Sequence, residues 1–428
     1  MSFMQQETVQ ALFMAFFILS TALKVFLSVR QSRHVLKHDQ QVPRRFQQAI
    51  SLSEHQAAAD YTLAKQRLAR YQIIFDGFVL LLLTLGGGFN WLAVLSMAVS
   101  DGPLTQGLLL ICAYILVSFV LSWPLIYYRQ FKLESDFGFN QSSLGLFIAD
   151  QFKGLAFLAV IGLPFVWLVL WFMGVAGGLW WLWAWAATVG FTLFIQWFFP
   201  TVIAPRFNRF EPLPEGELKT AVLDLLDQTG FDSQGLYVMD GSKRSSHGNA
   251  YFSGMGKHKR IVLFDTLINQ LSTDEIVAVL AHELGHFKKK HVQKGMVRRM
   301  GFTLIALGLL HAVMQQSGFY AGLGVEVNFA SHAMALLLFT LVLPLFTFVF
   351  SPIGFMFSRR DEYEADAFAC AHSQPEHLIS ALVTLYKRNA STLTPDPLYA
   401  WFYDSHPRAE LRIKAIEALA TEKEQHHA

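Results

Sequence analysis

Long apolar segments divide the chain and predict helices that cross a membrane. A spanning helix needs about 20 predominantly apolar residues to bridge the hydrocarbon core. Seven segments approach or meet this length. They cover residues 9–27, 73–97, 108–127, 155–174, 179–203, 301 to about 320, and 329–357. The sixth is the weakest, because His311, Gln315 and Gln316 dilute it, so the pattern admits six or seven spans.

Basic residues between these segments alternate from one side to the other. Residues 28–72, 128–154, 204–300 and 358–428 hold 33 of the 34 Lys and Arg residues, and Lys24 is the exception. Basic residues accumulate on the cytoplasmic side of membrane proteins. The alternation therefore favours seven spans, with the amino terminus outside and the carboxyl terminus in the cytoplasm. The first span lacks the positive leading region and cleavage site of a signal peptide, so we expect it to stay attached.

Two polar regions on the predicted inner side are long enough to form a folded catalytic part. We divide the chain into spans one to five (1–203), a cytoplasmic region (204–300), spans six and seven (301–357) and a cytoplasmic tail (358–428). Three short segments with β-branched and aromatic residues predict a small sheet; they are 235–240, 249–254 and 260–265. Ser272 and Glu275 have the spacing of a capping box, which predicts a helix over 273–293.

Composition agrees with a membrane protein and excludes several other classes. The 428 residues are 53% hydrophobic and 15% charged, with a mean hydropathy of +0.35, whereas soluble domains carry about 25% charged residues. The 39 Phe and 10 Trp residues exclude intrinsic disorder. The net charge of +2, without a basic arm, argues against nucleic acid as a partner. The expected fold is mainly α, a polytopic membrane protein with a zincin-like catalytic region carrying a small β-sheet.

The predicted helix over 273–293 carries a metal-binding pattern. Its sequence His282-Glu283-Leu284-Gly285-His286 has the H-E-x-x-H form. Residues four apart share one face of a helix, so both imidazoles can bind a single Zn²⁺. Glu283 beside them can then take a proton from water at the metal. The alternative interpretation is an ordinary helix with two histidines of structural role.

A catalytic zinc site of this kind requires a third protein ligand from elsewhere in the chain. An acidic segment follows the last predicted span and offers Asp361, Glu362, Glu364 and Asp366. Glu362 and Asp366 are four residues apart, so a helix would present both on one face. One of the two could bind the metal while the other orients a ligand histidine. A solvated acidic helix end with ordinary ion pairs is the alternative.

These segments together resemble the type I CAAX prenyl endopeptidases, a family of integral-membrane zinc metalloproteases with seven spans. The resemblance covers nearly the whole chain. It rests on His282 to His286, on Ser358-Arg359-Arg360 with Glu362 to Asp366, on Asn249-Ala250-Tyr251, on Pro205 to Phe210, and on Ser405-His406-Pro407 with Arg412. The family often reads His-Pro-Pro, whereas Arg408 follows Pro407 here.

The resemblance implies roles for individual residues. It makes Glu362 the third zinc ligand and Asp366 the support of a ligand histidine. It also implies that Asn249 holds the substrate backbone, and that His406 and Arg412 face the reacting carbonyl or the carboxyl end of the substrate. The residues alone did not indicate these last three roles, since His406 also fits a turn and Arg412 a solvated helix.

The sequence thus predicts an endopeptidase with one Zn²⁺ per chain, held by His282, His286 and Glu362. Its expected partners are a peptide or protein substrate, which the resemblance implies is prenylated, and membrane lipids. Three alternatives remain: a quality-control protease that needs no prenyl group, a channel or transporter with a structural zinc, and a scaffold without metal. The expected location is a bacterial inner membrane or the endoplasmic reticulum.

Overall fold

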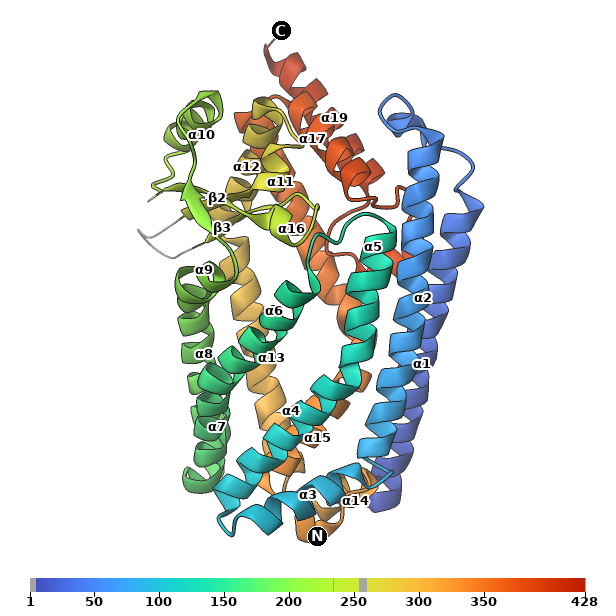
Figure 1. Ribbon diagram of the computed structural model, residues 1–428, viewed down its shortest axis with the longest axis vertical. Coiled ribbons are helices and arrows are strands. Elements are labelled where there is room, and N and C mark those ends of the chain that lie inside the picture. The colour runs from blue at the N-terminus through green and yellow to red at the C-terminus, as the bar shows by residue number, and fades with distance from the viewer. Residues whose placement is uncertain (1–4, 234, 254–259, 428) are drawn as a thin grey trace.

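The computed structural model describes residues 5–233, 235–253 and 260–427. Long helices stand along the longest axis, and the sheet with its covering helices lies at one end (Figure 1). Six helical segments are long and apolar enough to cross a membrane, or seven if one bent pair is counted as a span. Five of the six run over Gln6–Lys37 (α1), Pro103–Asp136, Leu144–Val175, Gly177–Phe207 and His291–Val313 (α13), and the sixth is His332–His372.

Several of these segments are longer than the sequence predicted because helix continues past the apolar stretch. α4 (Pro103–Tyr128), α6 (Leu144–Phe157) and α8 (Trp180–Phe198) each pass directly into a π-helical turn. These turns are Arg129–Leu133, Leu158–Gly162 and Phe199–Ile203. The first two lead into α5 (Glu134–Asp136) and α7 (Leu163–Val175), and the third into α9 (Ala204–Phe207). Exposed apolar side chains on these helices, such as Val160 and Ile305, both 72% exposed, suit contact with lipid rather than water.

Two predicted spans are wrong in detail. The second is not one straight helix, because α2 (Leu52–Leu83) and α3 (Gly88–Val99) meet at 56°. Gly87 has φ +76°, a left-handed conformation that glycine adopts without strain, and it forms the break. The sixth ends at Val313 rather than near residue 320, because α14 (Ser317–Gly322) is a separate short helix. The predicted seventh is α15 (His332–Thr347), a single helical turn and α16 (Ser351–His372).

A four-stranded sheet forms in the first polar region. Its order is β1-β2-β4-β3, with β2 parallel to β4 and the outer pairs antiparallel. β2 (Leu236–Met239), β3 (Ala250–Ser253) and β4 (Arg260–Phe264) confirm the three predicted strands. The predicted end of the second strand, Gly254, lies outside the described residues. The sequence missed β1 (Phe210–Pro212), which is three residues long and too short to show an alternating pattern.

Helices cover this sheet at the end of the molecule opposite α3 (Figure 1). They are α10 (Glu217–Gln228), α11 (Asp265–Ile268), α12 (Thr273–Lys288), α17 (Pro375–Arg388) and α19 (Ala409–His427), whereas α18 (Pro397–Tyr403) packs on α16 and α1. An apolar core joins the sheet to α10, α12, α16 and α17. The core includes Ile261, Leu263, Ile276, Leu280 and Ala381, each at most 1% exposed.

The helix predicted from the capping box begins as expected and ends early. Ser272 Oγ accepts a hydrogen bond from the N–H of Glu275, whose carboxylate accepts one from the N–H of Ser272. The helix stops at Lys288 rather than at Gln293. Lys290 adopts a left-handed conformation, with φ 59°, so the chain turns before α13 starts at His291. The predicted single helix is therefore two helices.

Candidate metal centre

The two histidines of the H-E-x-x-H sequence lie together on α12, and a carboxylate of α16 stands opposite. His282 Nε2 and His286 Nε2 are 3.2 Å apart. Glu362 places one carboxylate oxygen 3.5 Å from His282 Nε2 and the other 3.3 Å from His286 Nε2. One donor atom from each of the three residues lies within 4.8 Å of the others. His282 and Glu362 are buried, at 7% and 4% exposure.

Gly285 allows α12 and α16 to approach closely. A Cβ atom at this position would lie 2.9 Å from the Ala365 Cα and 3.0 Å from the Phe368 Cβ. Such distances are too short for carbon atoms, so any larger residue would push the helices apart. Glycine at the second variable position of the motif therefore brings Glu362 to the histidines.

The cluster fits a tetrahedral metal ion. Donors 2.0 to 2.2 Å from such an ion are roughly 3.3 to 3.6 Å apart. The two histidine Nε2 atoms are 3.2 Å apart, and each lies 3.3 or 3.5 Å from a different oxygen of Glu362, so the spacing of the donors is close to this geometry. Glu362 Oε2 is buried and makes no hydrogen bond in the described residues, although His406 Nδ1 is 2.8 Å away. That approach is short but misses hydrogen-bond geometry, so a lone pair of this oxygen stays free for a cation. Two imidazoles and a carboxylate are the donors that zinc prefers.

Asp366 and Arg412 form a buried pair behind His282. Asp366 Oδ1 lies 2.8 Å from His282 Nδ1. Arg412 donates to both oxygens of Asp366, from Nη2 at 2.6 Å and from Nε at 2.9 Å. Burial alone would lower the pKa of His282, but the neighbouring carboxylates of Asp366 and Glu362 outweigh it and raise that pKa to about 9. A metal ion that binds His282 would have to displace the proton that gives this imidazole its positive charge.

His291 forms a second support that sequence reasoning missed. His286 Nδ1 lies 3.0 Å from His291 Nδ1, and His291 Nε2 lies 3.2 Å from Glu364 Oε2. Because His286 directs Nε2 at the cluster, its Nδ1–H donates to His291. The other ring nitrogen of His291 then donates to Glu364. On one continuous helix His291 would be rotated by about 140° from His286, so only the turn at Lys290 places it here.

The other predicted site residues have different surroundings. Glu283 is partly buried, and no side-chain hydrogen bond or ion pair involves it among the described residues. His406 is 59% exposed and reaches Glu362, whereas Arg412 is 6% exposed, with Nη1 3.4 Å from Glu362 Oε2. Asn249 is exposed just before β3, and its Oδ1 accepts a hydrogen bond from the Ala250 N–H. The structure thus connects six of the predicted residues in one cluster: His282, His286, Glu362, Asp366, His406 and Arg412. No described side-chain hydrogen bond or ion pair joins Glu283 or Asn249 to it.

The spanning helices and this cluster define a multi-pass membrane metalloendopeptidase. Two family descriptions match the chain: "CAAX prenyl protease N-terminal, five membrane helices" over residues 31–209, and "Peptidase family M48" over residues 212–420. The chain belongs to the CAAX prenyl protease 1 family.

Relatives from distant organisms support the assignment. The CAAX prenyl protease 1 of Saccharomyces cerevisiae is 36% identical over 323 residues, 72% of this chain and 71% of that protein. The CAAX prenyl protease 1 homolog of Homo sapiens is 29% identical over 440 residues, 92% of each chain. The crystal structure of S. mikatae Ste24p superposes with a TM-score of 0.90, at 29% identity, covering 96% of this chain and 99% of that one. The match confirms the helical membrane fold.

Proposed function

We propose that this protein is a zinc-dependent endopeptidase that cleaves prenylated CAAX-type peptides. The observation that carries the proposal is the convergence of His282 and His286 with Glu362 at distances that suit zinc. The names of the relatives supply the substrate class, a peptide whose carboxyl-terminal Cys-a-a-X sequence carries a prenyl group. Membrane helices beside the site suit a lipidated substrate.

His282, His286 and Glu362 would hold the zinc ion. When bound, zinc supplies Lewis acidity toward the scissile carbonyl. Glu283 follows His282 on the same helix and is free of other side-chain partners in the described residues, so it can take a proton from the attacking water. It then delivers that proton to the leaving amine nitrogen.

Supporting residues fix the two histidines. Asp366 accepts hydrogen bonds from Nε and Nη2 of Arg412 and contacts Nδ1 of His282, which directs Nε2 of that histidine at the metal. His291 does the same for His286. Arg412 therefore acts as a positioning residue. His406, which is more exposed, is the donor available to stabilise negative charge on the reacting carbonyl oxygen.

Asn249 would hold the substrate backbone at the edge of the sheet. β3 is the last strand in the order β1-β2-β4-β3, so its outer side has no described strand beside it. An extended peptide can add to such an edge by main-chain hydrogen bonds. Exposed Asn249 stands at the start of that edge.

We also propose that the amino terminus lies outside and the carboxyl terminus in the cytoplasm, in a bacterial inner membrane or the endoplasmic reticulum. The start of α1 and the helix α19 lie at opposite ends of the long axis (Figure 1), as an odd number of spans requires. The site and most basic residues then share the cytoplasmic side.

The test compares the wild type with Glu283→Ala in detergent. We expect one zinc per chain in both proteins, and cleavage of a farnesylated CAAX peptide only by the wild type, with a rate loss of about 10³-fold or more for the variant. A chelator should abolish cleavage, and added zinc should restore it. The products are identified by mass spectrometry.

Three outcomes would contradict parts of the proposal. Absence of zinc from the purified wild type would contradict the proposed metal centre. Full activity of Glu283→Ala would exclude its role as the base. Equal cleavage of the farnesylated and unlipidated forms of one peptide would instead favour a quality-control protease.

A further inference from the structure

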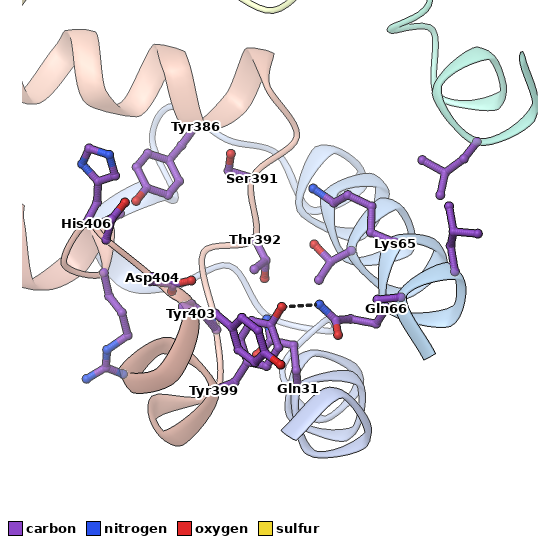
Figure 2. Close-up of a pocket in the computed structure, with 18 of the residues that line it drawn as sticks. Gln31, Lys65, Gln66, Tyr386, Ser391, Thr392, Tyr399, Tyr403, Asp404 and His406 are labelled. Atoms are coloured by element: carbon purple, nitrogen blue, oxygen red, sulfur yellow. Dashed lines mark hydrogen bonds between the residues drawn. The ribbon is translucent and has the colours of Figure 1, made fainter. Parts of the chain in front are cut away.

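A polar cavity of about 620 Å³ opens beside the metal centre. Its walls come from α1, α2, the segment from Arg129 to Glu134, Tyr386 on α17, and the chain between Ser391 and Ala409. Figure 2 shows part of this lining. His406 belongs to this wall and also reaches Glu362, with its Nδ1 2.8 Å from Oε2. The cavity and the metal centre therefore share one side chain. Its volume lies in the range of ligand-binding pockets, roughly 300 to 1,000 Å³.

Three cations line this cavity without a carboxylate at ion-pair distance in the described residues, although Glu134 acts electrostatically on Lys65 from farther away. Within the described residues, Lys65, Arg129 and Arg408 have no Asp or Glu oxygen within 4.0 Å. The Lys65 ammonium lies 3.9 Å from the centre of the Tyr61 ring, and Arg129 donates to the neutral Gln72. Figure 2 shows Lys65 extending from α2 toward the opposite wall. These groups are available to an anionic ligand.

The acidic residues of the cavity do not balance the cations. Both Glu134 oxygens lie within 3.0 Å of the Tyr61 hydroxyl, which donates to this carboxylate. Burial raises the pKa of Asp404 to about 6, against the opposing influence of Arg359 and His406, so this group loses its charge in mild acid. Three cations against two acids leave the cavity positive. We therefore expect it to attract a carboxylate or another anion.

Aromatic side chains make the rest of the wall suitable for a peptide. Tyr386, Tyr399 and Tyr403 line the cavity, and the rings of Tyr399 and Tyr403 stack with centroids 4.6 Å apart. Tyrosine offers an apolar ring and a hydroxyl, which suits aliphatic side chains and peptide groups alike. Figure 2 shows Tyr386 beside His406, and Tyr399 and Tyr403 near Gln66 and Gln31.

We propose that this cavity binds the peptide on the carboxyl side of the scissile bond, and that Lys65 and Arg129 bind its free α-carboxylate. This inference rests on the proposed endopeptidase function. Arg412 is not available for that carboxylate, because it is buried and donates to both oxygens of Asp366. The cavity would thus select substrates whose chain ends shortly after the cleaved bond.

The test uses two farnesylated peptides that differ only in having a free carboxylate or a carboxamide at the end. We expect the wild type to cleave the free acid with a kcat/KM about tenfold or more above that of the amide, as the loss of a charge-assisted hydrogen bond requires. The double variant Lys65→Gln, Arg129→Gln should reduce this ratio to about twofold or less. Lys65→Arg keeps the charge and should retain most of the preference.

Lys132→Gln is the matched control. Lys132 lies one helical turn from Arg129, but it pairs with Asp136 and does not line the cavity. Its substitution should leave the ratio unchanged.

The outcomes separate this inference from the proposed function. Equal cleavage of acid and amide by the wild type, an unchanged ratio in the double variant, or a ratio in Lys65→Arg as low as in the double variant would overturn the carboxylate site. The endopeptidase function would stand in each case, since both peptides are still cleaved by a zinc-loaded protein. Cleavage of neither peptide by zinc-loaded wild type would overturn both.

Discussion

Each histidine of the candidate metal centre has a supporting contact that ends on a carboxylate. His282 is held by Asp366, which is fixed by Arg412, and His286 is held by His291, which contacts Glu364. In both cases the ring nitrogen away from the metal has a partner, so the ring orientation and the tautomer are set before metal binds. The two supports come from different helices, α16 and α13.

Loss of the support on His286 should weaken the site without unfolding the protein. We expect His291→Ala to lower zinc affinity by about 10- to 100-fold, because His286 loses the acceptor for its Nδ1–H. Competition with a chelator of known affinity measures this change. His372→Ala is the control, since among the described residues the hydrogen bond and the ring contact of His372 both go to Phe368 on the same helix. Unchanged zinc affinity in His291→Ala would show that His286 needs no such support.

Asp404 should make carboxylate selection depend on pH. Its pKa is raised to about 6, so the group is neutral below that pH and becomes an anion above it. The new charge opposes a substrate carboxylate in the same cavity. We expect the acid-to-amide ratio of kcat/KM to fall by about two- to fivefold between pH 5 and pH 7.

The ratio cancels pH effects that both peptides share, including those on zinc ligands. Asp404→Asn removes one titrating group of the cavity, which also contains His406, and should make the ratio clearly less dependent on pH. A wild-type ratio that rises with pH, or an equal fall in Asp404→Asn, would contradict the assignment.

At the scale of elements, the close packing of α12 on α16 decides whether a metal centre forms. Gly285→Ala inserts a methyl group where the backbone of Ala365 already lies. We expect it to destabilise the protein by about 1–3 kcal/mol and to reduce bound zinc, because the helices must separate. Thermal unfolding in detergent and zinc content measure the two effects.

A second glycine provides the control for this substitution. Gly301 on α13 has open space around its missing Cβ, so Gly301→Ala should leave both quantities near the wild-type values. If Gly285→Ala bound a full equivalent of zinc with unchanged stability, the close contact between α12 and α16 would not determine whether the metal centre forms.

Turns inside helical patterns account for the elements that the sequence placed wrongly. Lys290 and Gly87 each take a positive φ and divide one predicted helix into two. The three Lys residues 288–290 favour a helix by propensity, so nothing local marks the turn. The contact between His291 and His286, which this turn makes possible, offsets the strain of the left-handed backbone conformation at Lys290.

At the scale of the whole molecule, the proposed orientation predicts which side each terminus faces. An epitope tag at the carboxyl terminus should be cleaved by added protease in vesicles with the cytoplasmic face outward, and a tag at the amino terminus should be protected. Vesicles of opposite orientation should reverse the pattern. Exposure of both tags on one face would require an even number of spans and would refute the charge-based orientation.

The sequence by itself determined the membrane class and most of the spans, and it predicted the pair of candidate metal-binding histidines that the fold brings together. These are local properties: a run of about 20 apolar residues matches a bilayer, and a spacing of four places two side chains on one helical face. The same logic identified Glu362 and Asp366 as a pair, and family resemblance assigned their roles.

Tertiary structure decided which groups meet across elements. Only the approach of α16 to α12, permitted by Gly285, brings Glu362 rather than Asp361 or Glu364 into the cluster with both histidines. Only the fold shows Arg412 bound to Asp366, His291 turned behind His286, and three cations without a described ion pair in the cavity that His406 also lines. Such contacts join residues distant in the chain or separated by a turn, and a periodic pattern carries no information about them, because it records the face of one element and not its neighbour.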